Sequence, residues 1–140
     1  CLEHNPYWRE TVANMLRMTR PGGLVLISCA TTGRKEHGTS RTNPDASPFT
    51  SAAKWDYYRN LRASDLAEAV NLPGWLADHA AWVNDLTKDR DFVGIRHGSG
   101  RRLPAALREA LDRRYAMTAS AKAFRRGLKD LILGDLQSRP

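Results

Sequence analysis

Hydrophobic and polar positions along the chain change between helical and strand-like patterns. Apolar residues recur from Trp8 to Leu16 at the spacing of one helix face, after an Asn5-Pro6 pair that favours a helix start. "RPGG" ends this helix, and the apolar run "LVLISCA" follows without alternation. Such a run predicts a strand buried on both faces, as in a parallel sheet. "CLEH" would then be the tail of the preceding strand, in a strand–helix–strand crossover.

The pattern after this strand predicts a loop, a short helix, a hairpin and more helix. Residues 31–48 are dense in Gly, Pro, Ser and Thr, which indicates a long loop. Ser64-Asp65 can cap a short helix over "LAEAV". "WLADHAAWVND" and "RDFVGIRHG" predict two strands that "LTKD" joins as an antiparallel hairpin. Helical periodicity returns after Gly98-Ser99-Gly100 in two segments, 103–115 and 119–136.

Composition narrows the class of protein. The 140 residues are 41% hydrophobic, enough for one domain, and no apolar run approaches the roughly 20 residues that span a membrane. Two cysteines, Cys1 and Cys29, do not form a disulfide framework, so we expect reduced thiols and a cytoplasmic protein. The net charge of +7 is uneven: residues 1–98 carry 12 Lys and Arg against 11 Asp and Glu, whereas residues 99–140 carry 10 against 4. The basic segment could meet nucleic acid or an anionic membrane, or simply form a solvated helix face.

Residues 1–98 carry a family likeness. "LEH", a helix, "RPGG" and "LVLIS", followed by a long loop, a helix and a terminal hairpin, resemble the second half of class I S-adenosylmethionine-dependent methyltransferases. The resemblance implies an α/β fold: part of a Rossmann-like sheet, with parallel strands and a terminal antiparallel hairpin. Residues 99–140 lie outside the likeness and are expected to form a basic helical extension.

The resemblance also implies a cofactor and a reaction. The family's glycine-rich turn and the acidic residue that takes the cofactor's ribose would precede Cys1, so the chain is expected to be a C-terminal fragment that is inactive alone. Within it, Cys1 and Leu2 are expected on the cofactor side. The expected function of the parent protein is methyl transfer from S-adenosylmethionine to an O or N nucleophile of a small molecule.

Candidate site residues lie after the two successive predicted strands. The resemblance places Glu3 and His4 at the catalytic edge, where His4 or His37 could act as general base. In some relatives a Glu-His pair helps to hold a divalent ion, and whether a metal is used here stays open. The loop residues Arg34 and Glu36 and the aromatic residues Tyr57 and Tyr58 are candidate substrate contacts, although packing in the core or on a helix is the favoured interpretation of the aromatic residues.

Two other classes of function remain. One is a non-catalytic binding module that uses its basic tail on nucleic acid or membrane. The other is a different Rossmann-like enzyme, such as a nicotinamide-dependent reductase, whose fingerprint needs tighter glycine spacing.

Overall fold

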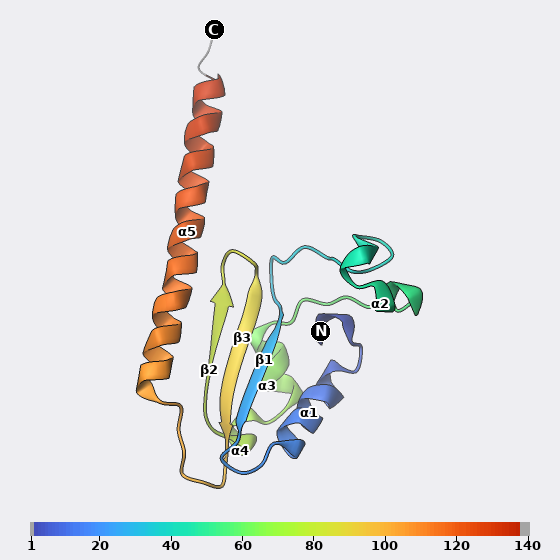
Figure 1. Cartoon of the computed structure of the whole chain (residues 1–140), viewed down its shortest axis with the longest axis vertical. Coiled ribbons are helices and arrows are strands. Elements are labelled where there is room, and N and C mark those ends of the chain that lie inside the picture. Colours follow the sequence, from blue (N-terminus) through green and yellow to red (C-terminus); the bar gives the residue numbers. More distant parts are fainter. Residues whose placement is uncertain (1, 138–140) are drawn as a thin grey trace.

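The computed structural model describes residues 2–137, with side chains for residues 2–50 and 52–126, and has an α/β fold. A three-stranded sheet lies at its centre, with helices against both faces (Figure 1). The elements, with η marking 3-10 helices, are η1 (Leu2–His4), α1 (Trp8–Met18), β1 (Leu24–Ala30), η2 (Pro44–Ala46), α2 (Pro48–Ala52), α3 (Ala63–Ala69), α4 (Leu72–Trp75), β2 (Leu76–Asn84), β3 (Asp89–Arg96) and α5 (Ala105–Gln137).

The sheet has the order β1-β3-β2, and both pairings are antiparallel. The predicted hairpin is confirmed as β2 and β3, with Val93 of β3 opposite Ala80 of β2 and Leu26 of β1. Because β1 and β2 are each antiparallel to β3, these two strands run in the same direction without being neighbours. The parallel pairing that the sequence predicts is therefore not seen between any strands of residues 2–137.

Strand β1 is buried on one face, not on both as the sequence predicts. Val25, Ile27 and Cys29 point into the core, whereas Leu24 and Leu26 are 56% and 61% exposed. The difference arises because α5 covers the second face of the sheet beside β2 and does not extend over β1 (Figure 1). An apolar run indicates that both faces of a strand can be buried. It does not indicate whether another element of the fold covers each face.

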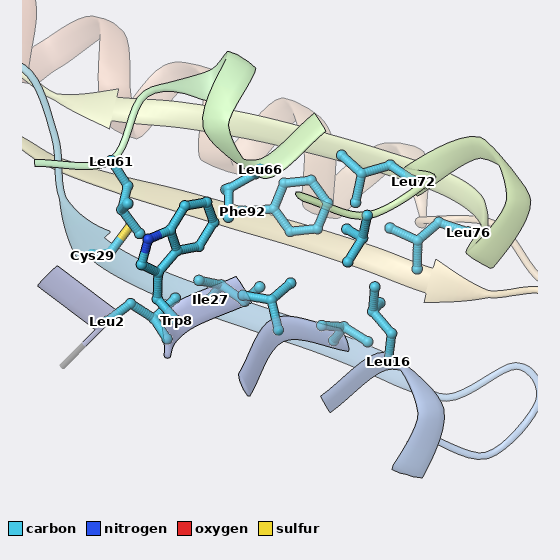
Figure 2. Close-up of a cluster of buried hydrophobic side chains, with 13 residues drawn as sticks. Leu2, Trp8, Leu16, Ile27, Cys29, Leu61, Leu66, Leu72, Leu76 and Phe92 are labelled. Carbon is cyan, nitrogen blue, oxygen red and sulfur yellow. The ribbon is translucent and has the colours of Figure 1, made fainter. Parts of the chain in front are cut away.

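The main core lies between β1, β3 and the helices α1 and α3. Trp8 of α1 is fully buried and points toward Leu61 and Cys29 (Figure 2). Leu16, about two helical turns further along the same face of α1, is also fully buried. Phe92 of β3 closes the same cluster. The spacing from Trp8 to Leu16 thus places one apolar stripe of α1 on the sheet, as its periodicity predicts.

The N-terminal turn differs from the predicted strand tail. Leu2–His4 is a 3-10 turn, which the bond from the Asn5 backbone N–H to the Leu2 carbonyl closes at 3.1 Å. Helix α1 begins at Trp8, three residues after the predicted start. Asn5 still organises this start, because its Oδ1 accepts a hydrogen bond from the Tyr7 backbone N–H at 2.9 Å and its Nδ2 donates to Thr11 Oγ1 at 2.9 Å.

The extended segment before α3 joins the N-terminal turn to β1. The Leu61 backbone N–H donates to the Ala30 carbonyl at 2.9 Å, and the Arg59 N–H donates to the Glu3 carbonyl at 2.8 Å. The Thr31 hydroxyl, buried beside them, donates to the Leu61 carbonyl at 2.6 Å. These bonds hold Glu3 and His4 beside the carboxyl end of β1.

Helix α5 is one continuous helix instead of the two segments that the sequence predicts. The Thr118 hydroxyl donates to the Tyr115 carbonyl at 2.8 Å and accepts from the Asp85 N–H at 3.2 Å, so the junction region is held in helical form against the hairpin turn. Its 33 residues correspond to about 50 Å. The helix extends past the sheet (Figure 1), and no helix described in residues 2–137 is long and apolar enough to cross a bilayer.

The first half of α5 packs closely on the sheet. The Tyr115 ring stacks on Trp82 of β2 at 5.9 Å, and Trp82 Nε1 donates to Asp112 at 2.7 Å. Asp78 of β2 accepts from Arg108 Nη2 at 2.9 Å. Contacts therefore cross the predicted boundary between residues 98 and 99.

Candidate functional site

A cleft of about 690 Å³ lies beside the carboxyl end of β1. One side is formed by η1 and the residue after it, Glu3, His4 and Asn5, together with His37. The other side is formed by the segment 46–55, which includes α2 and ends at Trp55. Figure 1 shows α2 standing apart from the sheet on the side of the N-terminus. The cleft thus has one wall anchored to the sheet and one wall made by a separate excursion of the long loop.

Two histidines and a tyrosine meet at the anchored wall. The ring centroids of His4 and His37 are 5.3 Å apart, and the Tyr58 ring lies 5.2 Å from each, edge to face. The three residues come from η1, the loop after β1 and the extended segment before α3. The structure therefore brings together the two histidines that the sequence nominates as bases.

Hydrogen bonds orient the His37 ring. Its Nδ1 lies 3.0 Å from the Lys35 carbonyl oxygen, which can only accept, so Nδ1 carries the proton and donates. The Tyr58 hydroxyl donates to the same carbonyl at 3.2 Å. Nε2 of His37 is then the nitrogen with a free lone pair, available to a proton or another electrophile.

The environment of His4 favours its neutral form. Burial lowers the pKa of His4, and the neighbouring His37 lowers it further against the opposing effect of Glu3. Its Nδ1 is buried without a hydrogen-bond partner among the described residues. A neutral imidazole at a cleft wall is able to accept a proton at neutral pH.

Glu3 is ionised beside the two histidines. Burial raises the pKa of its carboxyl, but hydrogen bonds, including those from the backbone N–H groups of Glu3 and Ala30, outweigh burial and lower it overall. Burial also raises the pKa of Tyr58 to about 12, with the Glu3 charge contributing, so Tyr58 stays protonated and acts as a donor.

The same cluster could hold a metal ion. Ligand atoms of Glu3, His4 and His37 all lie within 4.8 Å of one another. Two imidazoles and a carboxylate suit a divalent transition metal, and the Nδ1–H of His37 on a backbone carbonyl is the outer-shell contact that orients such ligands. The ligand atoms of the three side chains are therefore neighbours, and binding of an ion would require small movements that bring them closer together.

The predicted substrate contacts Arg34 and Glu36 lie away from the cleft. Arg34 donates to the Thr87 carbonyl and pairs with Asp89 at 3.9 Å, on the side of the β2–β3 turn. Glu36 accepts from the Thr39 hydroxyl at 2.7 Å and from Arg41 at 2.7 Å. Both side chains are bonded within the fold and hold this loop in place.

The remaining predicted residues are distributed between core and periphery. Leu2 is 5% exposed and packs in the main core, and Tyr57 packs against the edge of that core. Cys1 lies outside the described residues. Cys29 is buried, and burial raises the pKa of its thiol to about 11, which does not suit a nucleophile.

Sequence reasoning missed most of the far wall of the cleft. Phe49 is 89% exposed and Trp55 is 42% exposed, and both line the cleft. Trp55 stands out in the sequence as one member of an aromatic cluster, but Phe49 has no periodic signal. The available signal was a large aromatic residue within an otherwise polar loop.

The chain matches no protein-family model, no curated protein and no solved structure.

Proposed function

We propose that the chain forms the acceptor side of a cytoplasmic S-adenosylmethionine-dependent methyltransferase that methylates an O or N nucleophile of a small molecule. The observation that carries the proposal is the position of Glu3, His4 and His37 at the carboxyl end of β1, beside a cleft of about 690 Å³. In open α/β sheets this edge is where ligands bind.

The sheet order is consistent with the resemblance. In the terminal part of the methyltransferase sheet, the last strand enters antiparallel beside its hairpin partner. Here β3 is antiparallel to β2, its partner in the hairpin, and also to β1. The helices α1 and α3 precede and follow β1 in the expected chain order. This agreement in topology is the second observation that supports the proposal.

The described residues offer no fit for the cofactor itself. Of the two residues expected on the cofactor side, Leu2 has its side chain in the core and Cys1 is not described. S-adenosylmethionine would supply the methyl group when bound. The proposal assigns to this chain the binding and orientation of the acceptor and the removal of its proton.

Proton removal is the chemistry that the cluster supports best. A hydroxyl or ammonium group at the histidine wall would lose its proton to His4 or to Nε2 of His37, and Glu3 would stabilise the imidazolium that forms. The Lys35 carbonyl, which accepts from Nδ1–H of His37 and from the Tyr58 hydroxyl, fixes the ring of His37 for this role. Positioning the nucleophile in line with the methyl group would supply the remaining rate enhancement.

The proposal is tested on the protein that carries this chain. Calorimetry should show binding of S-adenosylmethionine, and transfer of a labelled methyl group should be measured against a panel of small-molecule alcohols and amines. A His4→Gln, His37→Gln double variant should lose about 100-fold or more in kcat while it still binds the cofactor. The rate should rise with pH through a pKa below 6.5, because His4 must be neutral to act as a base. Absence of cofactor binding would refute the proposal.

A further inference from the structure

The cleft has a chemical polarity that indicates what class of molecule it takes. At one end stand the ionisable groups of Glu3, His4 and His37. The other wall carries the aromatic side chains of Phe49 and Trp55 and two alanines, and the Ser47 and Thr50 hydroxyls on it are hydrogen-bonded to each other at 2.6 Å. No Lys or Arg side chain is among the described residues that line it. A molecule that fits must therefore be apolar and polar at opposite ends and must carry no negative charge.

The two aromatic side chains that line the cleft, Phe49 and Trp55, are both exposed to solvent. Phe49 is 89% exposed although it lies in a cleft wall, and Trp55 is 42% exposed. Aromatic side chains of this size gain most from burial against a flat apolar surface, and ring pairs gain further from offset or edge-to-face contact. The exposed rings are what a planar aromatic ligand would cover.

The polar end selects against an anion. The Glu3 carboxyl lines this end, and no Lys or Arg side chain among the described lining residues is there to pair with a carboxylate or phosphate. Arg34, three residues before His37, is occupied by Asp89 and the Thr87 carbonyl. Imidazole nitrogens are hydrogen-bond partners for a hydroxyl group, which can both donate and accept. The polar end therefore favours a neutral hydroxyl group.

We propose that this cleft binds a neutral aromatic alcohol, with its ring against Phe49 and Trp55 and its hydroxyl group at His4 and His37. The inference rests on the proposed function only in identifying this ligand as the methyl acceptor. Binding of the alcohol itself does not require the methyl donor.

Binding is measured by calorimetry on the chain with 2-naphthol, and with naphthalene-2-sulfonate as the anionic molecule of the same ring. We expect 2-naphthol to bind about tenfold or more tightly than the sulfonate, because the described lining offers the sulfonate a carboxyl group and no Lys or Arg side chain. Phe49→Ala should weaken 2-naphthol binding about five- to tenfold through loss of ring contact. Phe124→Ala is the matched control, because Phe124 is 72% exposed on α5 and lies outside the cleft, and its affinity should equal that of the unaltered chain.

The outcomes separate this inference from the proposed function. Equal affinity for the two naphthalenes, an unchanged affinity in Phe49→Ala, or displacement of 2-naphthol by a simple sugar such as glucose would overturn the aromatic alcohol. Binding of 2-naphthol with the expected variant pattern, in a protein that does not bind S-adenosylmethionine, would sustain this inference while refuting the methyltransferase. Methylation of a sugar or an amine without 2-naphthol binding would sustain the methyltransferase and refute the aromatic alcohol as its ligand.

Discussion

Gly38 joins the two walls of the cleft, and replacing it tests the geometry of the site directly. Its φ of +64° is left-handed, and a Cβ built there would lie 2.6 Å from Ser47 Cβ and 3.2 Å from His4 Cε1. The first contact is far inside van der Waals distance, so Gly38→Ala must push the segment 46–55 away from η1. The variant should therefore be less stable and should bind 2-naphthol more weakly.

Gly100 isolates the part of the cost that comes from the backbone. Its φ of +68° is close to that of Gly38, but a Cβ at Gly100 meets nothing within 4 Å. Left-handed backbone costs an alanine about 1–2 kcal/mol, and the reduced entropy of the unfolded chain offsets about half of this. Gly100→Ala should then lose about 1 kcal/mol of stability. Gly38→Ala should lose about 1–3 kcal/mol more, because overpacking a tight contact costs that amount.

Urea unfolding provides the assay. With a slope of about 2 kcal/mol per molar urea, Gly100→Ala should lower the midpoint by about 0.5 M and Gly38→Ala by about 1–2 M. Calorimetry with 2-naphthol, on folded protein below the transition, should show weaker binding in Gly38→Ala only. If the two variants lost equal stability and bound 2-naphthol equally, the close approach of Gly38 to Ser47 and His4 would be refuted.

Three further predictions concern the core, the hairpin turn and α5. Leu16→Ala should lower the free energy of unfolding by about 2–5 kcal/mol, because Leu16 is fully buried. Met18 is 78% exposed, so Met18→Ala should change the free energy of unfolding by under about 0.5 kcal/mol. Equal losses of the two variants in urea unfolding would contradict the assignment of Leu16 to the core. Hydrogen bonds from lysines hold the pKa of Asp85 at about 2, so its contribution to stability is present above pH 3.8 and lost as pH falls toward 2. Asp85→Asn should therefore flatten the acid side of a stability–pH curve, and an unchanged curve would exclude this carboxyl. The exposed Arg125 and Arg126 should promote salt-sensitive binding to phosphatidylserine vesicles, and substitution of both by Glu should abolish this binding. If the substitution did not change vesicle binding, these arginines would form only a solvated face of α5.

The elements that the sequence predicts correctly are those that local pattern determines. The α1 stripe and the β2–β3 hairpin follow from residues within one element or one turn of each other. The burial of β1 does not, because the exposure of Leu24 and Leu26 depends on how far α5 extends across the sheet. The junction in α5 depends likewise on a tertiary contact, the bond from the Asp85 N–H to Thr118.

The candidate site shows the same division within a single loop. Arg34, Glu36 and His37 are close in sequence and offer similar chemistry, so pattern alone gives them one shared role. The backbone between them turns, and it directs Arg34 toward Asp89 and His37 toward His4. Only His37 belongs to the cleft wall, because the Lys35 carbonyl and the Tyr58 hydroxyl hold its ring there. Residue type thus identified the kind of chemistry, and the hydrogen bonds of the loop decided which residue can perform it.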